Sequence, residues 1–95
     1  MSYGKFIGDL PKALKRYIIA YDNLPNHEGC LLYVRGSRKV ILDARVFDHD
    51  REALSDSLYE IIEGPPDEKL RITVEAGRLI VQASGASELD TRRVA

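Results

Sequence analysis

The residues that most suggest catalysis form the tripeptide Asp48-His49-Asp50. A histidine between two carboxylates can be held in one orientation and can act as a general base. A nucleophile is missing nearby, because Ser55 and Ser57 fall on the helix expected to follow and neither has the context of a nucleophile elbow or a phosphate loop. Asp50 can instead cap that helix, with His49 exposed beside it. We therefore expect no enzyme, with a small enzyme that uses His49 as its base as an alternative.

Metal binding would need His27, Cys30 and His49 to converge, since imidazole and thiolate ligands suit zinc. Their spacing matches no familiar zinc pattern, and Cys30 fits equally well as a core residue facing Ala44. We predict no metal site and no cofactor.

Acidic residues are concentrated between positions 48 and 68, where eight carboxylates accompany Arg51 as the one basic residue. Four of them repeat at helical spacing and form a stripe opposite the apolar side of the expected helix: Glu52, Asp56, Glu60 and Glu63. Such a stripe is typical of a solvated surface, and it can also dock a basic partner.

Basic residues gather on an expected first helix and at the turn of an expected first hairpin: Lys12, Lys15, Arg16, Arg35, Arg38 and Lys39. They can contact phosphates, and without a base-reading motif that contact would be salt-sensitive and largely non-specific. The aromatic residues are scattered rather than interleaved with these cations, which weakens the case for nucleic acid.

Composition and length bound the remaining possibilities. The chain has 95 residues, with 14 basic and 15 acidic side chains and a formal net charge of −1. It therefore lacks the excess of basic residues that is typical of a dedicated nucleic-acid binder. One cysteine excludes an internal disulfide, and no stretch is apolar enough for a signal peptide or a membrane span. We expect a cytoplasmic protein.

Two amphipathic helices are predicted. The first covers Asp9 to Asn23, with Asp9 as its cap, and gathers its apolar residues on one face: Leu10, Leu14, Tyr17, Ile18 and Tyr21. The second covers about Asp50 to Glu63, and Gly64, Pro65 and Pro66 end it.

Two hairpins are predicted over 29–47 and 68–84. In the second, a two-residue turn at Ala76-Gly77 pairs Val74 with Leu79 and Ile72 with Val81, which leaves one face wholly apolar. In the first, a three-residue turn over 36–38 gives a consistent core face with the pairs Val34 with Val40, Leu32 with Leu42, and Cys30 with Ala44.

These elements predict an α+β fold, a two-layer sandwich of order αββαββ. Its four-stranded antiparallel sheet, made of two hairpins, carries both helices on one face. We expect one domain over 1–85, with a possible helix–hairpin repeat over 9–47 and 50–84, and a flexible tail over 86–95.

The predicted function is a small non-enzymatic protein–protein interaction module, either a homodimer or a small subunit or inhibitor of a larger assembly. An apolar sheet face left open by the helices would make the contact, through Leu31, Tyr33, Ile41, Phe47 and Ile80. The acidic stripe is its second surface. The alternative is a nucleic-acid-binding domain that uses the basic residues of the first helix and the first hairpin turn. No membrane contact is expected.

Overall fold

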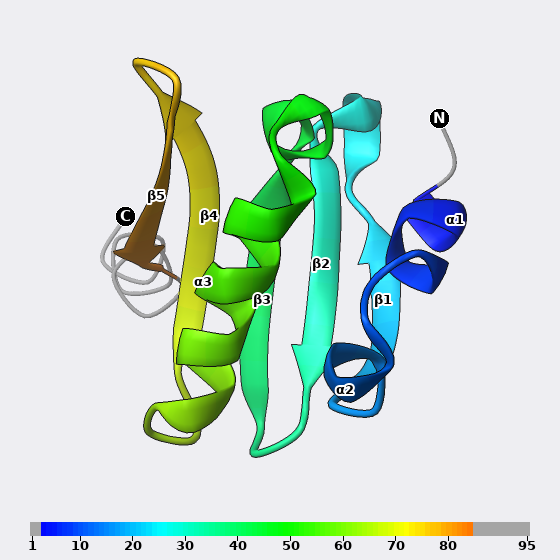
Figure 1. Cartoon of the computed structure of the whole chain (residues 1–95), viewed down its shortest axis with the longest axis vertical. Coiled ribbons are helices and arrows are strands. Elements are labelled where there is room, and N and C mark those ends of the chain that lie inside the picture. Colours follow the sequence, from blue (N-terminus) through cyan, green and yellow to red (C-terminus); the bar gives the residue numbers. More distant parts are fainter. Residues whose placement is uncertain (1–2, 85–95) are drawn as a thin grey trace, which may run out of the picture.

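The computed structural model describes residues 3–84. Along the chain (Figure 1) the elements are α1 (Tyr3–Gly8), α2 (Lys12–Lys15), β1 (Ile18–Asn23), the 3₁₀ helix η1 (Pro25–His27), β2 (Gly29–Val34), β3 (Arg38–Asp43), the 3₁₀ helix η2 (Ala44–Asp48), α3 (Arg51–Glu63), β4 (Lys69–Glu75) and β5 (Arg78–Ala83).

The five strands form one mixed sheet of order β1-β2-β3-β4-β5. Neighbouring strands are antiparallel except β3 and β4, which are parallel. The predicted four-stranded antiparallel sheet is therefore wrong in strand number and in direction. The reason is the connection through η2 and α3, which carries the chain back along the sheet, so that β4 starts at the same end as β3 (Figure 1).

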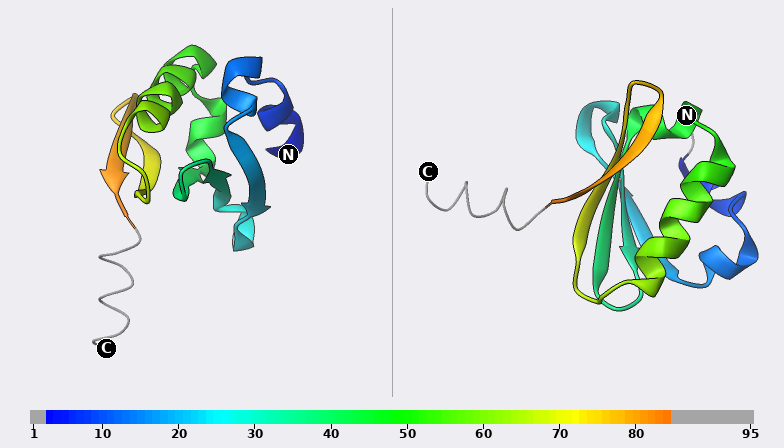
Figure 2. Two further views of the ribbon diagram at one scale, coloured as in Figure 1. Left: turned by 90° about the horizontal axis from the view of Figure 1, so that it is seen from below. Right: turned by 60° about the vertical axis from the view of Figure 1, so that its left-hand side comes forward.

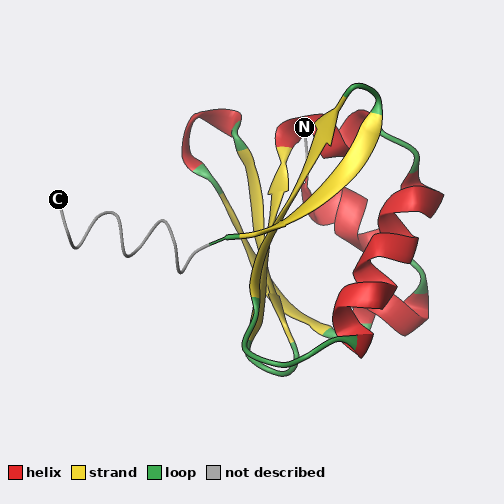
Figure 3. Cartoon of the chain, turned by 90° about the vertical axis from the view of Figure 1, so that its left-hand side faces the viewer, coloured by secondary structure: helices red, strands yellow, loops and turns green. Residues whose placement is uncertain are grey.

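The helices α1, α2 and α3 all lie on one side of the sheet (Figure 3). Between them and the strands is a single apolar core. Its fully buried members come from both layers: Leu14, Cys30, Leu32, Val40, Leu42, Val46, Leu54 and Ile72. The sheet is twisted (Figure 2), and the tip of the β4–β5 hairpin leans toward the start of α3 (Figure 3).

The predicted helix over 9–23 is wrong except at 12–15. Asp9 does not cap it, because Pro11 precedes α2 and the Asp9 carboxylate pairs with Arg51. The chain forms the four-residue helix α2, turns at Arg16 and Tyr17, and continues as strand β1. β-branched and aromatic residues from Ile18 onward favour a strand. Pairing with β2 stabilises this strand, and the helix prediction did not consider that pairing. Of the expected apolar face, Leu10 and Leu14 are buried, whereas Tyr17 and Tyr21 are exposed.

The second predicted helix is confirmed as α3, which starts and ends where its capping signals indicate. The Asp50 carboxylate accepts a hydrogen bond from the Glu52 amide at 3.0 Å. Gly64 follows the last helical residue, and two prolines follow Gly64. The stripe Leu54, Leu58 and Ile61 is buried against the sheet.

The predicted register of the second hairpin is confirmed, with Val74 opposite Leu79 and Ile72 opposite Val81. In the first hairpin, the core-facing residues are as predicted except Ala44, which belongs to η2, and the register is wrong by two residues. Leu32 pairs with Val40 and Cys30 with Leu42, because the three-residue turn falls on 35–37 rather than 36–38. A shift of two preserves the faces, so periodicity alone does not detect it.

Of the two proposed repeat units, the segment 50–84 has a long helix before its hairpin, whereas 9–47 has α2 and β1 in that place. The predicted flexible tail over 86–95 lies outside the described residues.

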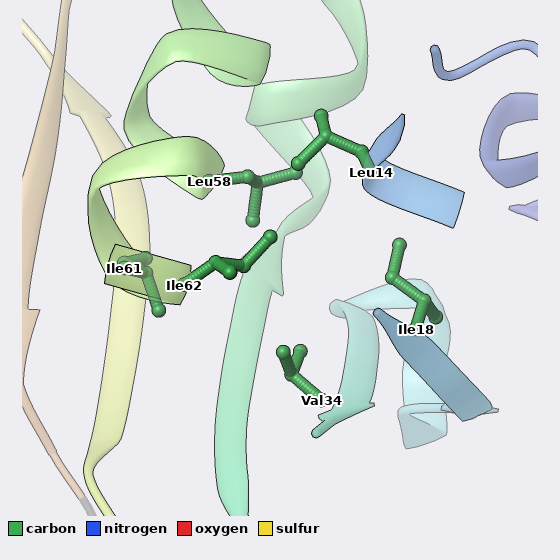
Figure 4. A pocket seen from close by; sticks show the side chains of 6 residues that line it. All are labelled: Leu14, Ile18, Val34, Leu58, Ile61 and Ile62. Carbon is green, nitrogen blue, oxygen red and sulfur yellow. The ribbon is translucent and has the colours of Figure 1, made fainter. Parts of the chain in front are cut away.

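A small apolar cavity of about 10 Å³ remains where α2 and α3 meet the sheet (Figure 4). Apolar side chains from both layers line it: Leu14, Ile18, Val34, Leu58, Ile61 and Ile62. A cavity of this size and lining offers a water no hydrogen-bond partner, so it is a packing defect rather than a ligand site.

The start of β2 depends on Gly29, which has φ +143° and lies opposite Asp43. A Cβ there would overlap the carbonyl oxygen of Leu42. We predict that Gly29→Ala lowers the free energy of unfolding by about 2–4 kcal/mol, measured by urea denaturation. Gly8→Ala is the control: a Cβ at Gly8 meets open space, so a change of less than about 1 kcal/mol is expected. Equal losses in the two variants would contradict this assignment.

Candidate interaction surface

The sheet face opposite the three helices, here called the open face, carries a row of apolar side chains. Leu31 and Ile41 are directly paired on β2 and β3, and Tyr33 shares their face two residues further along β2. Ile80 on β5 is opposite Thr73 of β4 on the same side. The four apolar side chains are half-buried, and none of the helices α1–α3 covers them (Figure 3).

A polar group borders the open face where β3 ends. The Asp43 carboxylate accepts hydrogen bonds from the amide and the Nε of Arg45, at 3.0 and 3.1 Å. The Arg45 Nη2 donates to the Thr73 hydroxyl at 3.1 Å, which ties the connection after β3 to β4. The hydrogen bond from Arg45 lowers the pKa of Asp43, so the pair stays ionised near neutral pH.

At the other border, the hydroxyl of Tyr33 donates to the Asp22 carboxylate at 3.0 Å. This hydrogen bond to a carboxylate is the main reason that the pKa of Tyr33 is raised. The Lys39 ammonium lies 5.8 Å from the centre of the Tyr33 ring, a cation–π contact. Tyr33 therefore keeps one orientation on the face, with its ring held between a carboxylate and an ammonium.

Strand β1 extends this surface, and sequence reasoning missed it because the segment was assigned to a helix. Its outer edge pairs with no strand among residues 3–84. The side chain of Ile19 is 68% exposed. That of Tyr21 is 40% exposed, but its pairing with the buried Leu32 places it on the helix-facing side of the sheet. Ile19 falls at an irregularity in the β1–β2 register. The β-branched and aromatic run from Ile18 to Tyr21 was the available signal.

Phe47, expected among the anchors of the open face, lies elsewhere. It belongs to η2 rather than to a strand, and it is buried. Its ring centre lies 4.4 Å from that of Tyr3 and 4.5 Å from that of Phe6, both on α1. These contacts attach the first helix to the core.

The acidic stripe forms as predicted on α3. All four carboxylates are exposed, because the apolar side of the helix packs on the sheet: Glu52, Asp56, Glu60 and Glu63. In the described part of the chain, none of the four forms an ion pair. The two ion pairs found there join Asp43 with Arg45 and Asp9 with Arg51.

The basic residues predicted for nucleic acid come from α2 and the β2–β3 turn, which lie at one end of the molecule (Figure 1). The Arg35 amide donates to the Tyr17 carbonyl at 2.9 Å, which places the turn beside the start of β1. Arg38 has a structural role, since its guanidinium donates to the carbonyls of Arg35, Gly64 and Pro65. The other cations of the set are exposed: Lys12, Lys15, Arg16, Arg35 and Lys39.

His49 has a structural contact. Its Nε2 lies 3.0 Å from the carbonyl oxygen of Gly77, which joins the start of α3 to the tip of the β4–β5 hairpin. Its Nδ1 is buried. Across residues 3–84, no three histidine, cysteine or acidic side chains come close enough to hold a metal ion, so His27, Cys30 and His49 do not converge.

Cys30 is fully buried in β2, on the side of the sheet that faces the helices. Desolvation, with a smaller contribution from the Asp22 carboxylate, raises the pKa of its thiol from 9.0 to about 11. A thiol of this kind is a poor nucleophile and a poor metal ligand near neutral pH.

Comparisons with protein-family models, curated proteins and solved structures gave no match to this chain. Within residues 3–84, no helix has both the length and the apolar character needed to cross a membrane. The function must therefore be inferred from the molecule's own surfaces.

The burial of Cys30 predicts a slow thiol. At pH 8, a disulfide reagent should modify the folded protein at least about a hundredfold more slowly than the urea-unfolded chain. A thiol pKa of about 11 instead of 9.0 lowers the thiolate fraction by about that factor. The modification is followed by absorbance, and the unfolded chain serves as the control for full reaction. Rates within tenfold of each other would show that Cys30 is accessible and available for chemistry.

Proposed function

We propose that this chain is a small non-enzymatic protein–protein interaction module, which acts as a homodimer or as a small subunit or inhibitor of a larger assembly. The open face and the adjoining edge strand β1 make the contact. One observation carries the proposal: the helices cover one side of the sheet, while Leu31, Tyr33, Ile41 and Ile80 lie on the other side. A reducing compartment such as the cytoplasm suits the free thiol of Cys30.

The exposed side chain of Ile19 on β1 supports the same surface. Ile19 and Tyr33 line one concave region, so the apolar row of the open face continues to the edge of the sheet. A free edge can accept a strand from a partner through main-chain hydrogen bonds, while neighbouring apolar side chains give specificity. We favour a contact that uses both the edge and the face.

The acidic stripe of α3 is the second surface of the proposed module. It lies on the outside of the helical layer, away from the open face, so a partner on the sheet leaves it accessible. Four neighbouring carboxylates repel one another, and basic side chains of a partner would relieve that repulsion.

A charge on the open face should abolish the contact and spare the fold. Ile41 is half-buried in the single chain, so Ile41→Asp costs little there, whereas an unpaired carboxylate in a covered interface costs several kcal/mol. We expect wild-type protein to sediment as a dimer and Ile41→Asp as a folded monomer, with dissociation constants that differ by more than about a hundredfold.

The two edge strands supply a matched pair of variants. Ile19→Lys on β1 should weaken the dimer as Ile41→Asp does, whereas Val81→Lys on β5, where the side chain is 43% exposed, should leave the dimer intact. Circular dichroism checks that all three variants fold. An equal effect of the lysines at both edges would contradict an interface on β1.

If the wild-type protein is monomeric at millimolar concentration, the homodimer is excluded and the same variants test a foreign partner. Wild-type and Val81→Lys proteins should then retain a partner from the native cell that Ile41→Asp loses. Retention by all three would rule out the open face.

A second candidate function, nucleic-acid binding, is favoured by the arrangement of the cations at one end of the molecule. α2 and the β2–β3 turn, far apart in sequence, are joined there by the hydrogen bond from Arg35 to Tyr17. We expect any such binding to weaken steeply between 50 and 200 mM salt, by about tenfold or more for three phosphate contacts, measured by fluorescence anisotropy with single-stranded and duplex DNA. Absence of binding at 50 mM salt would remove this candidate.

A further inference from the structure

A concave region of about 640 Å³ opens at one end of the open face, where the β2–β3 turn and the segment between α3 and β4 meet β1. The region shares Tyr33 and Ile19 with the proposed protein contact, whereas Ser37, Lys39 and Lys69 do not belong to that contact.

One wall of the region is cationic. Lys39 of β3 and Lys69 of β4 are direct partners in the parallel register, so two ammonium groups start from neighbouring positions on one face. Like charges in this arrangement repel, unless an anion lies between them. Arg38 does not add to this charge, because it pairs with the buried Val34 on the helix-facing side, where its guanidinium donates to the carbonyls of Gly64 and Pro65.

The carboxylates nearby do not neutralise this wall. Asp67 is the one acidic side chain among the residues that line the region, so the two lysines against one anion leave one positive charge. Within the described chain, neither Lys39 nor Lys69 forms an ion pair with Asp67 or with any other carboxylate. The hydroxyl of Ser37 on the same wall can donate a hydrogen bond to a bound anion.

Beside the lysines lie the Tyr33 ring and the side chain of Ile19. Tyr33 is the register partner of Lys39, whose ammonium lies 5.8 Å from the centre of the ring. The hydrogen bond from the Tyr33 hydroxyl to Asp22 fixes the ring without any ligand. A preorganised aromatic surface of this kind stacks a planar ring at little entropic cost, and stacking of one base on an aromatic side chain contributes about 1–3 kcal/mol.

We propose that this region binds a small organic anion in which a phosphate is joined to a planar ring, that is, a ligand of the mononucleotide class. The phosphate lies between Lys39 and Lys69, and the ring stacks on Tyr33. Both parts are needed, because two lysines at a solvent-accessible surface hold free phosphate weakly and one half-buried tyrosine there holds a free base weakly.

The test uses three probes with the full chain at low salt: adenosine 5′-monophosphate, inorganic phosphate and adenosine. Binding is followed by two-dimensional NMR of backbone amides. We expect the nucleotide to bind at least tenfold more tightly than either fragment, with the largest shifts at Ser37, Lys39 and Lys69. Equal affinities for the nucleotide and for phosphate would overturn the proposal.

Three variants separate the contribution of the lysines from that of the Tyr33 ring. Lys69→Gln should weaken nucleotide binding about tenfold, and Tyr33→Leu should lower nucleotide affinity to that of phosphate. Arg78→Gln, an exposed cation at the far tip of the β4–β5 hairpin, makes the same change of charge and should have no effect. A loss with Arg78→Gln as large as that with Lys69→Gln would reduce the effect to net charge and overturn the site.

The last probe is a single-stranded oligonucleotide of ten nucleotides. Affinity for the strand close to that for the nucleotide supports a pocket for one small ligand. An affinity more than a hundredfold higher, with a steep salt dependence, would make the region one contact of a nucleic-acid surface and would overturn the proposal of a free ligand.

Discussion

The parallel pairing of β3 with β4 determines the rest of the structure. The β4–β5 hairpin alone is a two-stranded ribbon, and such a ribbon is marginally stable in water. The ladder from Lys39–Lys69 to Leu42–Ile72 joins it to the three strands β1, β2 and β3 in one sheet. A parallel pair needs a long crossover, and here the crossover contains α3 with its buried stripe of Leu54, Leu58 and Ile61. Because that helix lies on one face, the pairing also decides which side of the sheet is left without helices.

Local sequence signals predicted the elements whose cause is local. The caps around α3 and the alternation in β4 and β5 are complete within a few residues, and both predictions are confirmed. The segment 9–23 was ambiguous, because its apolar residues satisfy a helical spacing over the whole stretch, while Ile18 to Tyr21 is also a short β-branched and aromatic run. Pairing with β2, a contact remote in sequence, decided between them. The parallel ladder was unpredictable for the same reason, since no turn specifies which strand edges meet.

The same difference between local signals and contacts remote in sequence applies to the candidate site. Period-two alternation indicated a second apolar face with Leu31, Tyr33 and Ile41, and the register places them together. Phe47 was misplaced because the strand was extended beyond Asp43, where η2 begins. Lys69 was missed altogether. Its significance comes from lying opposite Lys39 across the parallel pair, and a linear pattern does not record neighbours that are thirty positions apart.

The contacts of Arg38 connect the first hairpin turn to the end of α3 in a way that bears on cooperativity. Its guanidinium holds the carbonyls of Gly64 and Pro65, and the Asp67 amide donates back to the Gly36 carbonyl at 2.8 Å. The hairpin turn and the C-terminal end of the helix are thereby tied by reciprocal bonds. Neither segment can open without breaking bonds of the other, so they belong to one unit of local unfolding. A molecule that makes the turn more rigid would also reduce fraying at the C-terminal end of α3. The turn and the end of the helix would then open and close together.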